Sequence, residues 1–302
     1  PLRNARAQRC SCDLDVVETT GTRMVPTGDD EQTGQLLEAA DEVYARISDS
    51  HSRARVYGRI GAAHWYRGDA GGVQEAYAEA LRRRREVGDR MLEGATLNGT
   101  GSFHYQFLGE FEAALDWYGQ AIEVRRAIGD KAGLATSLTY KANVHRDLGQ
   151  MIEARNLFEE ARPVLEQLGD PASLVENIYG TALLYQAVGR SADALLLFDE
   201  GTALCSSAPE CEYGAMILIE KAKLQRTLGM PREALASLAP AERLLETSPD
   251  TAEAIRLWQT RAQTSLDLGD QDAARDQMVR ALRLARELGD PALLSDTSTQ
   301  LA

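Results

Sequence analysis

The stretch GEFEAALDWYGQAIEVRRAIGD, residues 109–130, decides the fold of this chain. Its residues Ala114, Tyr118 and Ala121 follow one another at steps of four and three, so they share one face of a helix. The stretch opens with a glycine and closes with Gly-Asp. A glycine suits the left-handed position that ends one helix, and an aspartate suits the N-cap of the next. We therefore predict one helix bounded by two chain reversals.

The same pattern returns every 40 residues. The later copies of the small-large-small motif are Ala154–Phe158–Ala161, Ala194–Phe198–Gly201, Ala234–Leu238–Ala241 and Ala274–Met278–Ala281. A second column of small residues precedes each mid-repeat glycine: Ser102, Ala142, Ala182, Ala222 and Ala262. Self-similarity at such a period indicates a solenoid, in which each repeat buries its apolar face against its neighbours. The sequence thus predicts an all-α fold of antiparallel helix pairs.

The 40-residue period also divides the chain. Residues 1–27 show no repeat pattern and are expected to be irregular or a degenerate helix. Residues 28–302 form the predicted array: a half repeat 28–48, full repeats 49–88, 89–129, 130–169, 170–209, 210–249 and 250–289, and a partial repeat 290–302. The last segment stops within a first helix, so we expect the natural polypeptide to continue beyond Ala302.

One spacing departs from the period. Gly68 and Gly109 are 41 residues apart, and the extra residue falls in the helix that contains Asn98-Gly99-Thr100-Gly101-Ser102. Each glycine inside a helix costs about 1 kcal/mol relative to alanine. We predict a bulge or kink here.

Composition and motifs exclude several function classes. The net charge of −13 disfavours direct binding of nucleic acid or anionic membrane, and the basic run Arg82–Arg85 is interpreted as a solvated helix face. No stretch is long and apolar enough to span a bilayer. No phosphate-binding, zinc-protease or nucleophile-elbow motif is present, so we predict no enzymatic activity and no cofactor or metal. Cys205 and Cys211 flank an inter-repeat turn and could pair, but we expect free thiols in a cytoplasmic protein.

The repeat resembles the tetratricopeptide repeat family. Ala114-x3-Tyr118-x2-Ala121 matches the core of the family's second helix, and Ser102-x2-Tyr105 and Ala182-x2-Tyr185 match an element of its first helix. The period is 40 rather than 34, and Gly-Asp mostly replaces the family's closing proline. The resemblance implies a right-handed superhelix. The 40-residue array is similar to long-period arrays in signalling scaffolds and bacterial regulators. Residue usage favours a bacterial source.

The resemblance also implies that the first helices of successive pairs line a concave groove that binds a protein or peptide. Alternating Gln and Arg along one column offers donors for a peptide backbone or for acidic side chains, which would favour an acidic partner. An aromatic anchor pocket is expected at the N-terminal end. The predicted groove residues are Trp65, Tyr66, Phe103, Gln106, Phe107, Thr139, Asn143, Arg146, Tyr179, Leu183, Gln186, Lys223, Arg226 and Gln263.

We therefore predict a non-catalytic interaction scaffold that serves as the sensor or adaptor part of a larger signalling protein. The alternative is a regulatory arm of an enzyme, such as a cyclase, kinase, protease or transcription activator, whose effector domain lies outside this stretch. Self-association is a third possibility, because an array that ends in mid-repeat exposes an apolar end.

Overall fold

A computed structural model describes residues 57–58, 60–61, 64, 69–207, 211, 213–246, 252–288, 294 and 297. Throughout these residues the regular structure is helical and no strand occurs. The chain divides into two compact units, residues 1–149 and 150–302. The all-α repeat architecture is therefore confirmed for the described part of each unit, while the predicted repeat boundaries stay predictions.

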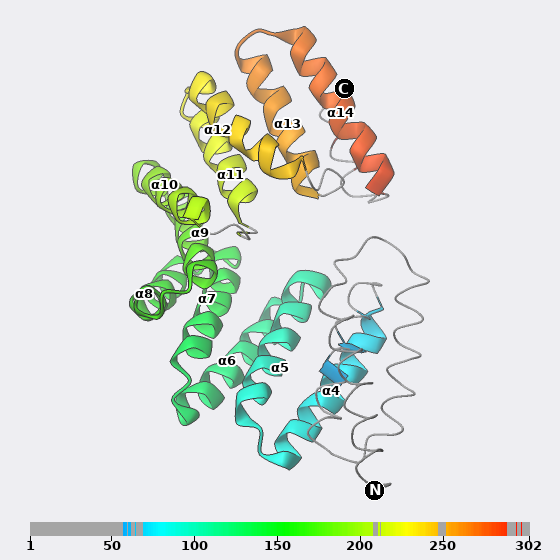
Figure 1. Ribbon diagram of the computed structural model, residues 1–302, viewed down its shortest axis with the longest axis vertical. Helices are drawn as coiled ribbons and strands as arrows, with labels where there is room; N and C mark the ends of the chain where they lie inside the picture. The colour runs from blue at the N-terminus through cyan, green and yellow to red at the C-terminus, as the bar shows by residue number, and fades with distance from the viewer. Residues whose placement is uncertain are drawn as a thin grey trace, which may run out of the picture. The chain divides into compact units, whose positions relative to one another are not determined.

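The first unit contains α4 (Ala70–Val87), α5 (Arg90–Ser102), the π-helix η1 (Phe103–Leu108), α6 (Phe111–Ile128) and α7 (Lys131–Asp147). Successive helices pack side by side, and α5 also contacts α7, the next first helix along the array (Figure 1). The small-large-small motif of α6 is buried, since Ala114, Tyr118 and Ala121 expose at most 1% of their surface.

The second unit contains α8 (Met151–Leu168), α9 (Pro171–Ala187), α10 (Ser191–Ser207), α11 (Gly214–Thr227), α12 (Pro231–Leu245), α13 (Ala252–Asp267) and α14 (Gln271–Leu288). Each helix packs against the next, and α11 also contacts α13 (Figure 1). The motif residues of α8, α10, α12 and α14 are all buried, and so are Ala182, Ala222 and Ala262 of the second column.

The turns follow the predicted chemistry. Gly129 has φ 71°, and Asp130 after it accepts a hydrogen bond from the Gly133 amide at 3.0 Å. A side chain at φ 71° would be strained, so glycine is needed to end α6 there. The same left-handed conformation occurs at Gly88, Gly109, Gly149, Gly169, Gly189, Gly229 and Gly269.

The predicted irregularity is a π-helix. It spans Phe103–Leu108, shortly after Gly99 and Gly101 of α5, and ends at Gly109. Glu110, the next residue, donates its amide to the His104 carbonyl. A π-turn accommodates one residue more than an α-turn, so it absorbs the residue that makes this repeat 41 long. Gly101 lies where a Cβ would be 2.7 Å from the Tyr118 ring, so α5 and α6 approach closely just before the π-helix.

A disulfide corrects one expectation. Cys205, in the last turn of α10, is bonded to Cys211, with Cα atoms 5.2 Å apart. The expectation of free thiols is therefore wrong for this pair. The two residues lie six positions apart in the sequence, one in the last turn of α10 and the other just before α11.

Candidate binding face

The predicted groove residues fall on the first helices of the repeats: α5 with η1, α7, α9, α11 and α13. Trp65 and Tyr66 lie outside the described residues. The remaining positions are considered separately in the two units. Their exposure and their hydrogen bonds decide which of them can contact a partner.

In the first unit the aromatic part of the prediction needs correction. Phe103 is fully buried and stacks on Phe107, with ring centroids 5.4 Å apart. Phe107 is 41% exposed and Gln106 is also exposed. The π-helix therefore exposes Phe107 and Gln106 to solvent, and the buried Phe103 packs beneath Phe107 instead of lining a pocket.

On α7 a second correction applies. Thr139 is only 1% exposed, so it belongs to the helix packing and cannot contact a ligand. Asn143 and Arg146, one turn and two turns further on, are partly exposed. The Arg146 guanidinium donates to Asn143 Oδ1 at 2.7 Å and from Nε to Asp147 Oδ1 at 2.9 Å. Arg146 is thus held in place along its own helix.

Asp147 also joins two first helices. The Tyr105 phenol of η1 donates a hydrogen bond to Asp147 Oδ2. Burial and the Asp147 carboxylate together raise the pKa of Tyr105. A tyrosine–aspartate hydrogen bond therefore connects η1 to the last turn of α7. The same bond holds Asp147, the carboxylate partner of Arg146, in place.

In the second unit Arg226 joins α11 to α13. Its Nε donates to Asp267 Oδ2 at 2.7 Å and its Nη1 donates to Gln263 Oε1 at 2.7 Å. Lys223, one turn earlier, is bound to Glu220 at 2.7 Å. Adjacent first helices are thus connected through the predicted column residues, and the Gln263 carbonyl is occupied by Arg226.

The three predicted residues of α9 have different surroundings. Tyr179 lies against Phe198 and Tyr213, with ring centroids 6.5 and 5.8 Å away, and Leu183 packs on the same apolar cluster. Both are partly exposed and can still offer an apolar edge. The Gln186 side-chain oxygen is shielded from solvent and accepts no hydrogen bond from the described residues, so it is an unsatisfied buried acceptor and not an exposed contact point.

Charge pairing changes the electrostatic expectation. Arg146, Lys223 and Arg226 each have a carboxylate within 2.9 Å. These three cations therefore form no unbalanced positive strip that would attract an acidic ligand. Sequence reasoning missed the carboxylates Asp147 and Asp267, although they occupy the same register three repeats apart and could have been found from the period.

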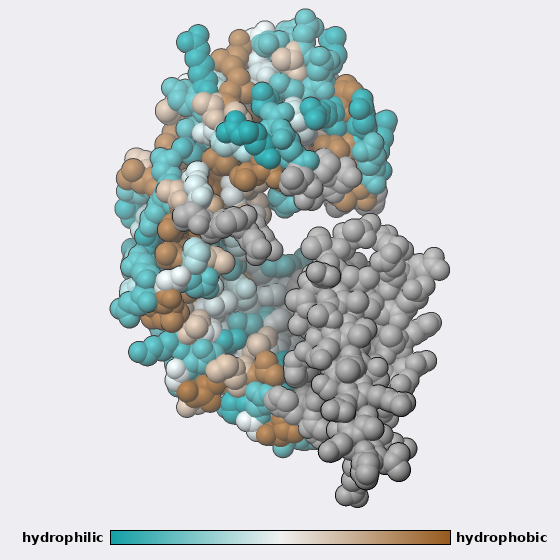
Figure 2. Space-filling model, viewed as in Figure 1, coloured by the Kyte–Doolittle hydropathy of each residue, from teal (hydrophilic) through white to brown (hydrophobic). Residues whose placement is uncertain are grey.

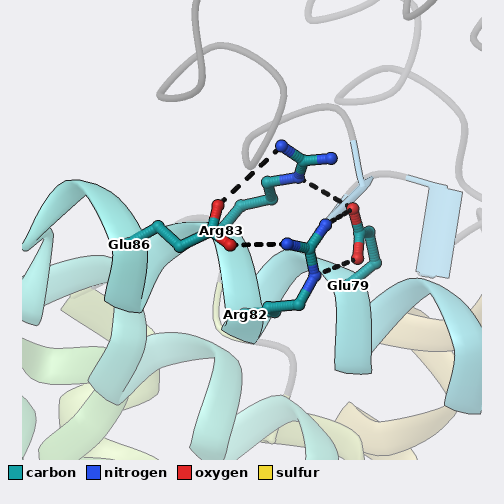
Figure 3. Close-up of polar contacts among 4 residues, drawn as sticks. All are labelled: Glu79, Arg82, Arg83 and Glu86. Carbon is teal, nitrogen blue, oxygen red and sulfur yellow. Dashed lines mark hydrogen bonds and ion pairs between the residues drawn. The ribbon is translucent and has the colours of Figure 1, made fainter.

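The basic run of α4 is also balanced. Arg82 binds Glu79 and Glu86, and Arg83 contacts the same two carboxylates (Figure 3). Arg84 is buried and donates to the Leu92 carbonyl at 2.8 Å, so the interpretation of the whole run as a solvated face is wrong at this residue. The run offers no free cationic patch for a polyanion.

The rest of the described surface is mixed. On the face that Figure 2 shows, hydrophobic residues form scattered patches among hydrophilic ones.

A cavity of about 190 Å³ lies between α12, α13 and α14. Its lining includes Glu242, Trp258 and Arg280, and the Arg280 guanidinium covers the Trp258 ring at 3.9 Å. Among the described residues no cluster of three potential metal ligands occurs, and no helix is long and apolar enough to cross a bilayer.

The fold is that of a helical-repeat protein whose first helices carry amide, cationic and aromatic side chains. Two family models described as tetratricopeptide repeat match this chain, one over residues 52–127, 92–167 and 133–207 and the other over residues 255–288. The chain belongs to the tetratricopeptide repeat family. A comparison with curated protein sequences found no significant match.

Three solved structures illustrate the shared fold. The signal-transduction ATPase with a tetratricopeptide repeat sensor from Pyrococcus horikoshii matches 98% of this chain and 45% of its own, at 10% identity and TM-score 0.72. The apo quorum sensor NprR from B. thuringiensis matches 97% of this chain and 80% of its own, at 12% identity and TM-score 0.63. A Rap protein complexed with Competence and Sporulation Factor matches 88% and 78%, at 10% identity and TM-score 0.64.

Proposed function

We propose that this protein is a non-catalytic scaffold that binds a peptide or a peptide segment of a partner protein on the inner faces of its first helices. The observation that carries the proposal is the arrangement on α11 and α13. There Arg226, Gln263 and Asp267 form a preorganised polar group beside the exposed Leu266. Hydrogen-bond donors and acceptors beside an apolar side chain suit a peptide, because a peptide presents amides, carbonyls and apolar side chains together.

Preorganisation supports affinity. A side chain that is already held by two hydrogen bonds loses less conformational entropy when a ligand arrives. Arg146 and Arg226 are held in this way, and each retains further N–H groups, because a guanidinium has five donors. We expect these donors to bind carbonyl or carboxylate oxygens of the peptide.

Fold likeness points in the same direction. One similar structure is described as a quorum sensor and another as a complex with Competence and Sporulation Factor. At 10–12% identity they support the fold alone, and the ligand class assigned here is our proposal. Cytoplasmic location, a bacterial source and a signalling role remain predictions from the sequence.

The test is an array of synthetic peptides whose net charge runs from acidic to basic, probed with the purified chain. Capture of a defined peptide set is expected, and Arg146→Ala with Arg226→Ala should raise the Kd of captured peptides about tenfold. Arg232→Ala with Arg275→Ala removes two exposed arginines from the second helices α12 and α14 and should leave Kd unchanged. Equal losses in both double variants, or no loss in the first, would refute the inner faces as the binding surface.

A second candidate function is a regulatory arm of an enzyme. It is favoured by the likeness to the ATPase with a tetratricopeptide repeat sensor, of whose chain the match covers 45%. Sequencing of the gene on both sides of this stretch separates the two candidates. A neighbouring catalytic domain supports the arm, and its absence supports a free-standing scaffold.

A further inference from the structure

We propose that Cys205 and Cys211 are a reversible redox-modification site, which exchanges with low-molecular-weight thiols and disulfides of the glutathione class and controls the order of the first turn of α11. The regulatory consequence, a change in peptide binding at α9, depends on the function proposed above. The modification site itself does not.

The pair stands where other repeats use a different turn. Asp89, Asp130 and Asp170 follow left-handed glycines and cap α5, α7 and α9 through their side chains. In the corresponding slot before α11 the sequence has Pro209-Glu210. The N-cap residue of α11, Tyr213, makes no side-chain cap hydrogen bond. The covalent bond between Cys205 and Cys211 therefore takes over the structural role of the glycine–aspartate turn at this junction.

The disulfide adjoins the start of α11 directly. The Cys211 carbonyl accepts from the Gly214 amide at 3.3 Å, and the Tyr213 carbonyl accepts from the Ile217 amide at 2.9 Å. A Cβ on Gly214 would lie 3.9 Å from Cys205 Sγ. The first turn of α11 is thus positioned by both half-cystines.

The same junction reaches the candidate binding face. The Tyr213 ring lies 5.8 Å from the ring of Tyr179, which is one of the predicted groove residues. Cys205, Cys211, Tyr213 and Tyr179 all pack on the cluster around Phe198 and Ile217. Opening of the disulfide removes a covalent restraint from Tyr213 and so loosens the support of Tyr179.

The chemistry balances as two exchange steps. A thiolate of the reduced pair attacks oxidised glutathione, which forms a protein–glutathione mixed disulfide and releases one glutathione thiolate. The second cysteine thiolate then attacks the protein sulfur of the mixed disulfide, which forms the Cys205–Cys211 bond and releases the second glutathione thiolate. Reduction by glutathione is the reverse. Both cysteines are only half-buried, which leaves an approach for the small thiol.

The experiment uses the whole chain with Cys10→Ser and Cys12→Ser, so that only the pair can react. The protein is equilibrated in glutathione buffers from fully reduced to fully oxidised, alkylated, and mapped by peptide mass. In parallel, amide hydrogen exchange is followed at residues 213–219 of the α11 junction and, as a control, at residues 135–142 of α7, which lie in the other compact unit. A Cys205→Ser with Cys211→Ser variant represents the open state under all conditions.

We expect the pair to convert between dithiol and disulfide within this range. Amide exchange at residues 213–219 should become about tenfold faster on reduction, while residues 135–142 change little. The double serine variant should match the reduced protein in both buffers. A pair that stays reduced in oxidised glutathione, or stays bonded in excess reduced glutathione, would overturn the exchange site. Equal exchange rates in the two states would overturn its control of the turn.

A last arm tests regulation with the synthetic peptide array. Weaker capture by the reduced protein is expected. Equal capture in the two redox states removes the regulatory consequence while the scaffold function stands. If no peptide is captured in either state, the proposed scaffold function fails, whereas the exchange site is judged by the mass and exchange data alone.

Discussion

Arg125 at the end of α6 donates from Nη1 to Asp130 Oδ2 at 2.9 Å, and the two side chains are only 10% and 12% exposed. Asp130 uses its other oxygen to cap α7 through the Gly133 amide. Burial lowers the pKa of Arg125, and the adjacent Asp130 carboxylate opposes that shift. One carboxylate therefore serves both as a helix cap and as the partner of a largely buried cation.

Replacement of Asp130 should consequently cost more than loss of a cap alone. Asp130→Ala leaves the Arg125 charge without its partner, and we expect the free energy of unfolding to fall by about 3 kcal/mol. Asp170→Ala removes a cap from α9 that is exposed, and should cost about 1 kcal/mol. Urea denaturation followed by circular dichroism measures both. Similar losses in the two variants would show that the ion pair adds nothing to the cap.

Gly99 and Gly101 of α5 provide a matched pair of substitutions. A Cβ at Gly101 would lie 2.7 Å from the Tyr118 ring, whereas a Cβ at Gly99 meets the Tyr77 ring only at 3.7 Å. We expect Gly101→Ala to destabilise by about 1–3 kcal/mol through overpacking and Gly99→Ala to stabilise by up to about 1 kcal/mol through helix propensity. Thermal unfolding of both variants checks this. Stability changes of the same sign in the two variants would mean that α5 and α6 do not approach as closely as described.

Glu93 distinguishes buried from exposed ion pairs. Its side chain is 2% exposed and is bound by Arg85 at 2.8 Å and by Arg90 at 2.6 Å. Glu93→Gln leaves both arginines with a neutral, poorer acceptor, and we expect a loss of about 2 kcal/mol. Arg82→Gln disrupts the exposed pairs of Figure 3 and should leave the denaturation midpoint unchanged. A midpoint shift for Arg82→Gln as large as that for Glu93→Gln would contradict this ranking.

The Tyr105–Asp147 bond predicts a pH dependence. The pKa of Tyr105 is raised in the folded protein, so the stability it contributes is complete below the unfolded pKa of about 10 and is lost as the pH rises from there toward the folded pKa. At neutral pH Tyr105→Phe should lower the free energy of unfolding by about 1 kcal/mol. Above about pH 10 the difference between wild type and variant should shrink. Urea titrations at neutral pH and in alkaline buffer test this. A difference in the free energy of unfolding that is the same at both pH values would show that the pKa of Tyr105 is not raised by folding.

Much of the fold was predictable because the information is local. The glycines that end helices and the aspartates Asp89, Asp130 and Asp170 that begin them act within a few residues, and each lies where the sequence predicts it. The extra residue near Asn98-Gly99 predicted an irregular helix, and η1 follows immediately. Local chemistry and a fixed period carry these predictions.

The binding face was less predictable, because exposure depends on neighbours that the sequence does not specify. Phe103 and Thr139 are both predicted groove residues, yet both are buried by packing. The arginines of the columns gained carboxylate partners such as Asp147 and Asp267, and Cys205 gained Cys211. The repeat register predicts on which side of its helix a residue lies. The packing of the neighbouring helix then decides whether that side chain remains accessible to solvent.

The sequence by itself determined the helix pairs, their turns and the small residues at which they meet, because backbone conformation and apolar periodicity are written into short segments. Only the tertiary structure decided which charges are balanced and which side chains reach solvent. Those properties arise between residues such as Arg226 and Asp267, which lie 41 positions apart and become neighbours only when α11 packs against α13.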